Sequence, residues 1–177
     1  MTESNSSLKD LEDDIPTRRQ GKFTVIKDRG LFALCSDDVN GYLQHNEIWE
    51  FGIYDEYEEN VYGDVLVAGL GLGYALRCVR TNRDVTSIDC VEIEQDIIDL
   101  VWDFVKEDRY NVFCADITEY LGRVTKEYDF ILLDIYGVDP SERTNSARAL
   151  CNLAKQRLKR GGTLQIVRIN DGVFTIP

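Results

Sequence analysis

The sequence predicts an α/β fold in which helices cover both faces of a parallel sheet. From residue 64 onward, short apolar runs alternate with segments of helical spacing, as is typical of strand–helix–strand units. The first apolar run breaks into glycines at alternate positions, Gly69, Gly71 and Gly73, before helical spacing resumes. Turns of this kind join the first strand and helix of many parallel sheets. We therefore expect residues 61–177 to form one α/β domain.

Five strands and four helices are expected after residue 64. The strands are predicted at residues 65–68, 86–92, 111–115, 129–134 and 163–168. The helices are predicted at residues 74–81, 95–107, 117–124 and 141–160. The last helix has a start signal at Asp139-Pro140-Ser141 and a stop signal at Gly161-Gly162, because an oxygen-bearing cap precedes proline and glycine follows the helix.

The N-terminal part of the chain has a different pattern. Residues 1–20 are polar and charged, which predicts a disordered lead-in. Residues 21–60 are expected to form a small β-unit and a connecting segment. Residues 22–27 alternate in polarity and residues 31–35 form a second short apolar run, with turn residues between them. Residues 44–57 carry aromatic and apolar side chains among acids, so we expect an irregular or helical segment there.

Composition limits the class of protein. The chain has 177 residues, 44% of them hydrophobic, which suits one core. No apolar stretch is long enough to cross a bilayer and the N-terminus lacks signal-peptide features, so a cytoplasmic protein is expected. Its five cysteines are widely spaced and lie mostly in apolar runs, which predicts reduced core residues, with no disulfide frame and no metal site.

The net charge of −12 bears on partners. An acidic surface repels polyphosphate, so nucleic acid is not expected as a partner, whereas a small cation such as a polyamine would be attracted. The alternative is that the charge serves solubility alone.

The glycine turn and an acidic strand end together predict an adenosine-type ligand. Glycines at 69, 71 and 73 let a ligand approach the backbone closely. Glu92 ends the next apolar run, where a carboxylate can accept hydrogen bonds from both hydroxyls of a ribose.

Two further strand ends carry acids. Asp116 can accept a hydrogen bond from an adenine amino group while Ile117 packs on the ring, or it can cap the helix that follows. Asp134 and Asp139 would face the reactive end of the ligand. A helix cap is the favoured role for Asp139, whereas Asp134 ends an apolar strand and has no evident local role. Aromatic side chains before the first strand, Tyr54 among them, either contact the ligand or anchor the β-unit to the core.

Several segments occur in an order that identifies a family. They are Gln44 with Glu50-Phe51, Gly69–Gly73, Val91-Glu92-Ile93-Glu94, Ala115-Asp116 and Tyr128–Asp134. In this order the chain, from about residue 23 to residue 167, resembles the spermidine synthase-like branch of the Rossmann-like class I S-adenosylmethionine-dependent methyltransferase fold.

The resemblance implies roles for individual residues. The nucleoside would be held by residues of the turn and of the first two strand ends: Gln44, Gly69, Leu70, Gly71, Gly73, Glu92 and Ile93. Asp116 and Ile117 would contact the adenine. Asp134 would lie beside the sulfonium as the base for an attacking amine. Apart from the resemblance, Tyr136 follows this strand end directly and can offer a ring to a sulfonium and a hydroxyl to a carboxylate.

The chain also departs from the family pattern. Aminopropyltransferases carry an aspartate in the glycine turn where this chain has Leu72. The segment from Asp134 to Pro140 is two residues longer than the family's gate and lacks its hydroxyls. The closing strands are absent or reduced to residues 173–176. An uncovered sheet edge favours pairing with another subunit, so a homo-oligomer is expected.

These observations predict an S-adenosylmethionine-using transferase or lyase. We expect it to act at the γ-carbon and release methylthioadenosine, by self-cleavage of the substrate or by aminopropyl transfer to a polyamine. Leu72 favours intact S-adenosylmethionine, because it removes a negative charge that would repel the α-carboxylate. The alternatives are a small-molecule methyltransferase and a catalytically silent nucleoside-binding module.

Overall fold

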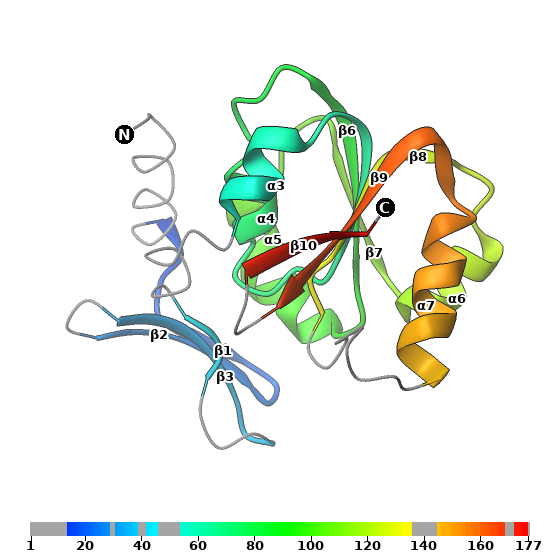
Figure 1. Ribbon diagram of the computed structural model, residues 1–177. Coiled ribbons are helices and arrows are strands. Elements are labelled where there is room, and N and C mark those ends of the chain that lie inside the picture. Colours follow the sequence, from blue (N-terminus) through cyan, green and yellow to red (C-terminus); the bar gives the residue numbers. More distant parts are fainter. Residues whose placement is uncertain are drawn as a thin grey trace.

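The computed structural model describes residues 14–28, 31–38, 42–45, 54–135, 145–168 and 172–176, and it contains two sheets (Figure 1). A four-stranded sheet has the order β1-β2-β3-β4, and a six-stranded sheet has the order β10-β9-β8-β5-β6-β7.

The N-terminal sheet is antiparallel throughout. Its strands are β1 (Arg18–Gln20), β2 (Phe23–Asp28), β3 (Leu31–Ser36) and β4 (Tyr42–His45). This sheet is the predicted β-unit, but it begins earlier than expected. Ile15 is fully buried in the core, and β1 lies within the segment expected to be disordered, because its polar residues pair with β2 through the backbone. Gln44 lies in β4 and not in an irregular or helical segment.

The central sheet contains the five predicted parallel strands. They are β5 (Gly63–Ala68), β6 (Val85–Glu92), β7 (Tyr110–Cys114), β8 (Tyr128–Leu133) and β9 (Leu158–Arg168). A sixth strand, β10 (Gly172–Ile176), pairs antiparallel with β9. The expected remnant of the closing strands, residues 173–176, lies in this strand.

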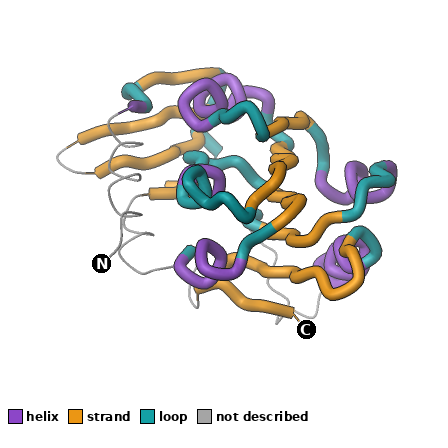
Figure 2. Tube along the Cα trace, turned by 90° about the horizontal axis from the view of Figure 1, so that it is seen from above, coloured by secondary structure: helices purple, strands orange, loops and turns teal. Residues whose placement is uncertain are grey.

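Helices cover both faces of this sheet (Figures 1 and 2). On one face lie α3 (Asp55–Asn60), α4 (Tyr74–Arg77) and α5 (Gln95–Val105), and on the other α6 (Ile117–Arg123) and α7 (Asn145–Lys155). Each face has its own cluster of buried hydrophobic residues. None of the helices in the described ranges combines the length and apolarity that a membrane span requires.

The largest difference from the predicted elements concerns the last helix. It ends at Lys155, and β9 begins at Leu158. The prediction that Gly161 and Gly162 stop the helix is therefore wrong. Both glycines lie inside β9, where the register against β8 shifts. Lys159 forms ion pairs with Asp64 (2.8 Å) and Asp129 (2.7 Å), which hold this segment against the sheet. The predicted start at residues 139–141 lies outside the described residues.

Candidate functional site

The carboxyl ends of three neighbouring strands bring the candidate site residues together. In the sheet β5 lies between β6 and β8. Beyond the ends of these strands, the amide of Gly69 donates to the carbonyl of Val91 (2.8 Å), and the amide of Asp134 donates to the carbonyl of Ala68 (2.8 Å). The glycine turn is thus linked to both acidic strand ends, at the edge where ligands of parallel sheets bind.

Glycine is required in this turn because other parts of the protein approach its backbone. Gly69 has a φ of 97°, and a Cβ there would lie 2.0 Å from the carbonyl oxygen of Asp134. A Cβ on Gly71 would lie 2.3 Å from Oε1 of Gln44, and one on Gly73 would lie 2.4 Å from Cγ1 of Val105. The glycines therefore allow the turn to pack tightly against Asp134, Gln44 and α5.

Glu92 is buried and bonded to the backbone on both sides. Its Oε2 accepts a hydrogen bond from the amide of Leu70 (2.9 Å), and its Oε1 accepts one from the amide of Glu94 (3.0 Å). A carboxylate offers about four acceptor positions, so two remain after these bonds. The side chain thus has the capacity that two ribose hydroxyls require.

A chain of three hydrogen bonds connects the glycine turn to Asp134. The amide of Leu72 donates to Oε1 of Gln44 (2.6 Å), and Nε2 of Gln44 donates to the hydroxyl of Tyr54 (3.2 Å). That hydroxyl donates to Oδ2 of Asp134 (2.5 Å). Tyr54 was predicted only as a ligand-contacting or anchoring aromatic. No local pattern reveals its bond to Asp134, because 80 residues separate the two.

The surroundings of Asp134 raise the pKa of its carboxyl toward neutral pH. Burial raises the pKa of its carboxyl from 3.8 to about 6; the bond from Tyr54 opposes this rise, and the nearby carboxylate of Glu92 adds to it. The Tyr54 hydroxyl has a pKa well above its usual value, first because it is buried and then because Asp134 lies beside it. Tyr54 therefore keeps its proton and remains a donor.

The predicted adenine contacts lie beside Glu92. The amide of Ala115 donates to the carbonyl of Glu92 (3.0 Å). Asp116 caps α6, since its Oδ1 accepts from the amides of Thr118 (2.8 Å) and Glu119 (3.1 Å). Asp116 therefore has one of its two predicted roles, the helix cap, and the contact with adenine stays a prediction.

The apolar residues at this end of the sheet differ in exposure. The side chain of Ile93 is 62% exposed, directly after Glu92, whereas Ile117 is buried in the core under α6. Ile93 is therefore available to a ligand, and Ile117 serves mainly to pack α6 against the sheet.

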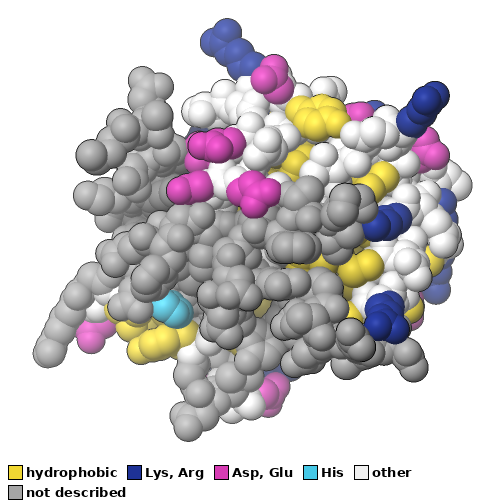
Figure 3. Space-filling view, viewed as in Figure 1, with side chains coloured by type: hydrophobic (Ala, Val, Ile, Leu, Met, Phe, Trp, Pro, Cys, Tyr) yellow, Lys and Arg dark blue, Asp and Glu magenta, His cyan; other side chains and the backbone are white. Residues whose placement is uncertain are grey.

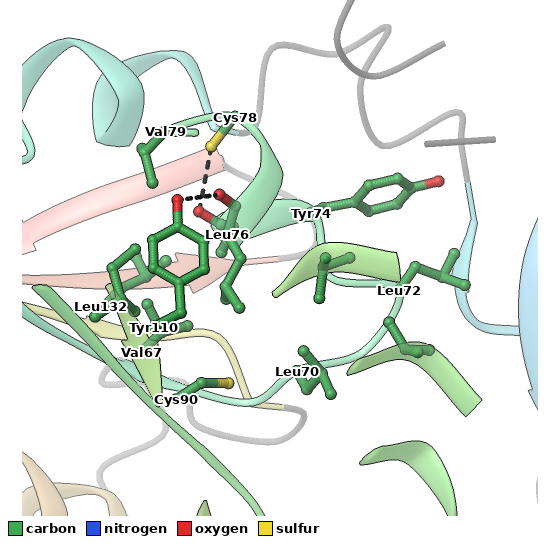
Figure 4. Packing of buried hydrophobic residues seen from close by; sticks show 14 of the residues in the cluster. Val67, Leu70, Leu72, Tyr74, Leu76, Cys78, Val79, Cys90, Tyr110 and Leu132 are labelled. Atoms are coloured by element: carbon green, nitrogen blue, oxygen red, sulfur yellow. Dashed lines mark hydrogen bonds between the residues drawn. The ribbon is translucent and has the colours of Figure 1, made fainter. Parts of the chain in front are cut away.

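Leucines 70 and 72 contribute backbone and not side chains to the site. Both side chains lie in the buried cluster that also contains Tyr74 (Figure 4). Their amides are the donors to Glu92 and Gln44. Position 72, acidic in aminopropyltransferases, is therefore a core position in this chain.

Two predicted catalytic residues, Tyr136 and Asp139, lie outside the described residues. Within the described ranges, no group of three or more histidine, cysteine, aspartate or glutamate side chains could hold a metal ion.

A family model for the spermine/spermidine synthase domain matches residues 44–171. No curated protein matches the chain. A solved spermidine synthase in complex with the transition-state analogue AdoDATO has a TM-score of 0.67 and 15% identity, covering 85% of this chain and 57% of that one. The spermidine synthase from Thermotoga maritima has a TM-score of 0.65 and 15% identity, covering 85% and 55%.

Methyltransferases share the fold more distantly. An S-adenosylmethionine-dependent methyltransferase from Clostridium acetobutylicum ATCC 824 has a TM-score of 0.51 and 15% identity, covering 68% of this chain and 49% of that one. The chain spans about half the length of these three solved proteins. Because the family model matches well over half of its residues, the chain belongs to the spermine/spermidine synthase domain family, on the Rossmann-like class I methyltransferase fold.

Proposed function

We propose that the protein is an enzyme that binds S-adenosylmethionine or a close relative and breaks its bond from sulfur to the γ-carbon, releasing methylthioadenosine. One observation carries this proposal. A half-buried carboxyl, Asp134, with a pKa of about 6 lies against the glycine turn and accepts a hydrogen bond from Tyr54. A general base works best when its pKa is close to the operating pH.

The nucleoside half of the substrate would be held at the turn. The two acceptor positions left on Glu92 suit the ribose hydroxyls. The exposed Ile93 would pack on the adenine ring, and the second carboxylate oxygen of Asp116 would accept from the adenine amino group. Family membership and the likeness to a spermidine synthase that binds AdoDATO support this placement.

The charge around Asp134 favours an amine as the attacking group. Glu92 and Asp134 are acids, and α3, which follows Tyr54, carries Asp55, Glu56 and Glu58 in its first turn. Figure 3 shows acidic side chains gathered over α3. A negative surface draws in cations, so a diamine or polyamine fits this environment.

The proposed transfer balances without any further reagent. The amine nitrogen forms a bond to the γ-carbon, the sulfur–carbon bond breaks and its electron pair stays on sulfur, which neutralises the sulfonium and frees methylthioadenosine. The nitrogen loses one proton to Asp134.

Self-cleavage is a second candidate, supported by Leu72. Because that side chain is buried in the core, the turn presents no acid to repel an α-carboxylate. The carboxylate of intact S-adenosylmethionine would then attack the γ-carbon and close a lactone, and no base would be needed.

Chromatography of reaction products tests the proposal. Purified protein is incubated with S-adenosylmethionine, or with its decarboxylated form, with and without putrescine. Methylthioadenosine that depends on putrescine supports transfer, and Asp134→Asn should then slow turnover by roughly 10²–10⁴-fold. Methylthioadenosine without any acceptor supports self-cleavage. S-adenosylhomocysteine together with a methylated acceptor would overturn both transfer and self-cleavage and would indicate a methyltransferase. If neither substrate gives a product, the proposal of an enzyme is wrong and the protein is a silent nucleoside-binding module.

A further inference from the structure

We infer that Gln44 is a positioning residue, which orients the hydroxyl of Tyr54 so that its proton points to Asp134. The resemblance implies a different role, a direct contact of Gln44 with the nucleoside. The inference rests on the proposed function only in that it takes Asp134 as the catalytic base.

The direction of the hydrogen-bond chain follows from its first donor. The amide of Leu72 can only donate, so the atom of Gln44 at 2.6 Å must be the carbonyl oxygen. The amide nitrogen of Gln44 must then face Tyr54, and it can only donate to the hydroxyl oxygen, 3.2 Å away. Because that oxygen accepts from Gln44, its own proton is directed to Oδ2 of Asp134.

Burial makes this chain the main polar support of Asp134. Gln44 is 8% exposed and Tyr54 2% exposed, so water competes little with either bond. Within the described ranges, Tyr54 donates the hydrogen bond that the Asp134 side chain accepts. Among the described residues, the other titratable groups around Asp134 are the carboxylate of Glu92 on β6, the thiols of Cys78 after α4 and Cys90 on β6, and the hydroxyl of Tyr57 on α3.

These neighbours cannot replace Tyr54. The thiols of Cys78 and Cys90 donate to the carbonyls of Ala75 (3.4 Å) and Gly69 (3.9 Å), and within the described residues the hydroxyl of Tyr57 has no hydrogen-bond partner. Glu92 repels a second negative charge. The ionised form of Asp134 therefore depends on the Tyr54 proton, and the orientation of that proton depends on Gln44.

A carbon-13 NMR titration of the Asp134 carboxyl in ligand-free protein tests the inference. In Gln44→Glu, the new carboxylate can accept the Tyr54 proton in competition with Asp134, so the titration midpoint should move to higher pH by roughly one unit or more. Gln44→Met keeps the length of the side chain and removes its polarity, and it should move the midpoint in the same direction by less. The control is Gln156→Glu, at an exposed glutamine directly after α7. It makes the same charge change and should leave the midpoint unchanged.

A double variant shows whether Gln44 acts through Tyr54. Tyr54→Phe alone should raise the midpoint, and adding Gln44→Met to it should raise it no further. If Gln44→Met shifts the midpoint equally with and without Tyr54, the inference is wrong. It is also wrong if both Gln44 variants, folded by their amide spectra, titrate like the wild type while their affinity for methylthioadenosine falls, because Gln44 would then be a ligand contact. Since the titration needs no substrate, a failure to turn over S-adenosylmethionine would sink the proposed function and leave this result standing.

Discussion

Glu92 and Asp134 lie at the carboxyl ends of β6 and β8, the two strands that flank β5. The protein stabilises the two carboxylates in different ways. Glu92 accepts hydrogen bonds from two backbone amides, so its position does not depend on a neighbouring side chain. Asp134 accepts from one tyrosine hydroxyl and has a raised pKa. At the scale of single residues, a carboxylate bonded to backbone suits binding, and one with a pKa near neutral suits proton transfer.

Replacing Glu92 should weaken nucleoside binding. We expect Glu92→Ala to reduce the affinity for methylthioadenosine by on the order of 2–3 kcal/mol, because hydrogen bonds to a charged acceptor are the stronger kind. Isothermal titration calorimetry measures the change, with Glu119→Ala, an exposed acid on α6, as the control. An unchanged dissociation constant in folded Glu92→Ala would rule out the ribose contact.

Replacing Asp134 should stabilise the protein at neutral pH while it impairs catalysis. The folded state holds the Asp134 proton more tightly than the unfolded chain, since the pKa rises from 3.8 to about 6. Ionisation therefore lowers the free energy of unfolding as pH rises through this window. We expect Asp134→Asn to be more stable than the wild type at pH 7 by about 1–3 kcal/mol, with most of the advantage gone at pH 4. Urea unfolding at both pH values measures it, and a difference that does not vary with pH would contradict the raised pKa.

At the scale of elements, the glycine turn is the least tolerant part of the site. Gly69→Ala would place its Cβ 2.0 Å from a backbone oxygen at a φ of 97°. Backbone cannot yield cheaply, so we expect a loss of about 2–4 kcal/mol in stability together with loss of ligand binding. Gly122→Ala is the matched control, because no atom lies within 4 Å of its Cβ inside α6. That variant should be neutral or more stable by up to about 1 kcal/mol. Equal thermal shifts in the two variants would contradict this reasoning.

The start of α6 separates the two predicted roles of Asp116. Asp116→Ser keeps a capping oxygen, whereas Asp116→Ala loses it and should cost about 1 kcal/mol in stability. If Asp116 also contacts adenine, both variants should bind methylthioadenosine more weakly. Thermal unfolding and calorimetry on the same samples distinguish the roles, and wild-type affinity in Asp116→Ser would leave Asp116 as a cap alone.

At the scale of the whole molecule, the site depends on both sheets. Gln44 belongs to the N-terminal sheet and contacts the turn of the central sheet. The two parts are also joined along α5, where Gln20 donates to Asp96 (3.3 Å) and Lys22 pairs with Glu94 (3.1 Å). The N-terminal sheet therefore packs against the central sheet and supplies Gln44 to the candidate site.

The central sheet leads us to expect an oligomer. β10 is its outermost described strand beside β9, and β7 is the outermost strand at the other side. Open strand edges favour pairing with another chain, so we expect a dimer or larger assembly in solution. Light scattering measures the mass, and a particle of 20.3 kDa at micromolar concentration would count against it.

Local patterns in the sequence were sufficient to predict the parallel strands, the glycine turn and the acidic strand ends of this protein. Alternating apolar runs predicted all five parallel strands, and glycines after the first run marked the turn. The acids at 92, 116 and 134 follow buried strands, and parallel strands bring their carboxyl ends to one edge. These features depend on residues within a few positions of each other, which is the range over which side-chain periodicity reports structure.

Tertiary structure alone decided the rest. The bond from Tyr54 to Asp134 joins residues 80 positions apart, and the bond from Leu72 to Gln44 joins residues 28 apart. β9 begins at Leu158, which pairs with Tyr128 of β8, and Lys159 pairs with Asp64 and Asp129 from other strands. The pKa of Asp134 and the burial of Leu72 also depend on what surrounds them in space. Burial, dielectric and hydrogen-bond partners are properties of the packed chain, so no local pattern could determine them.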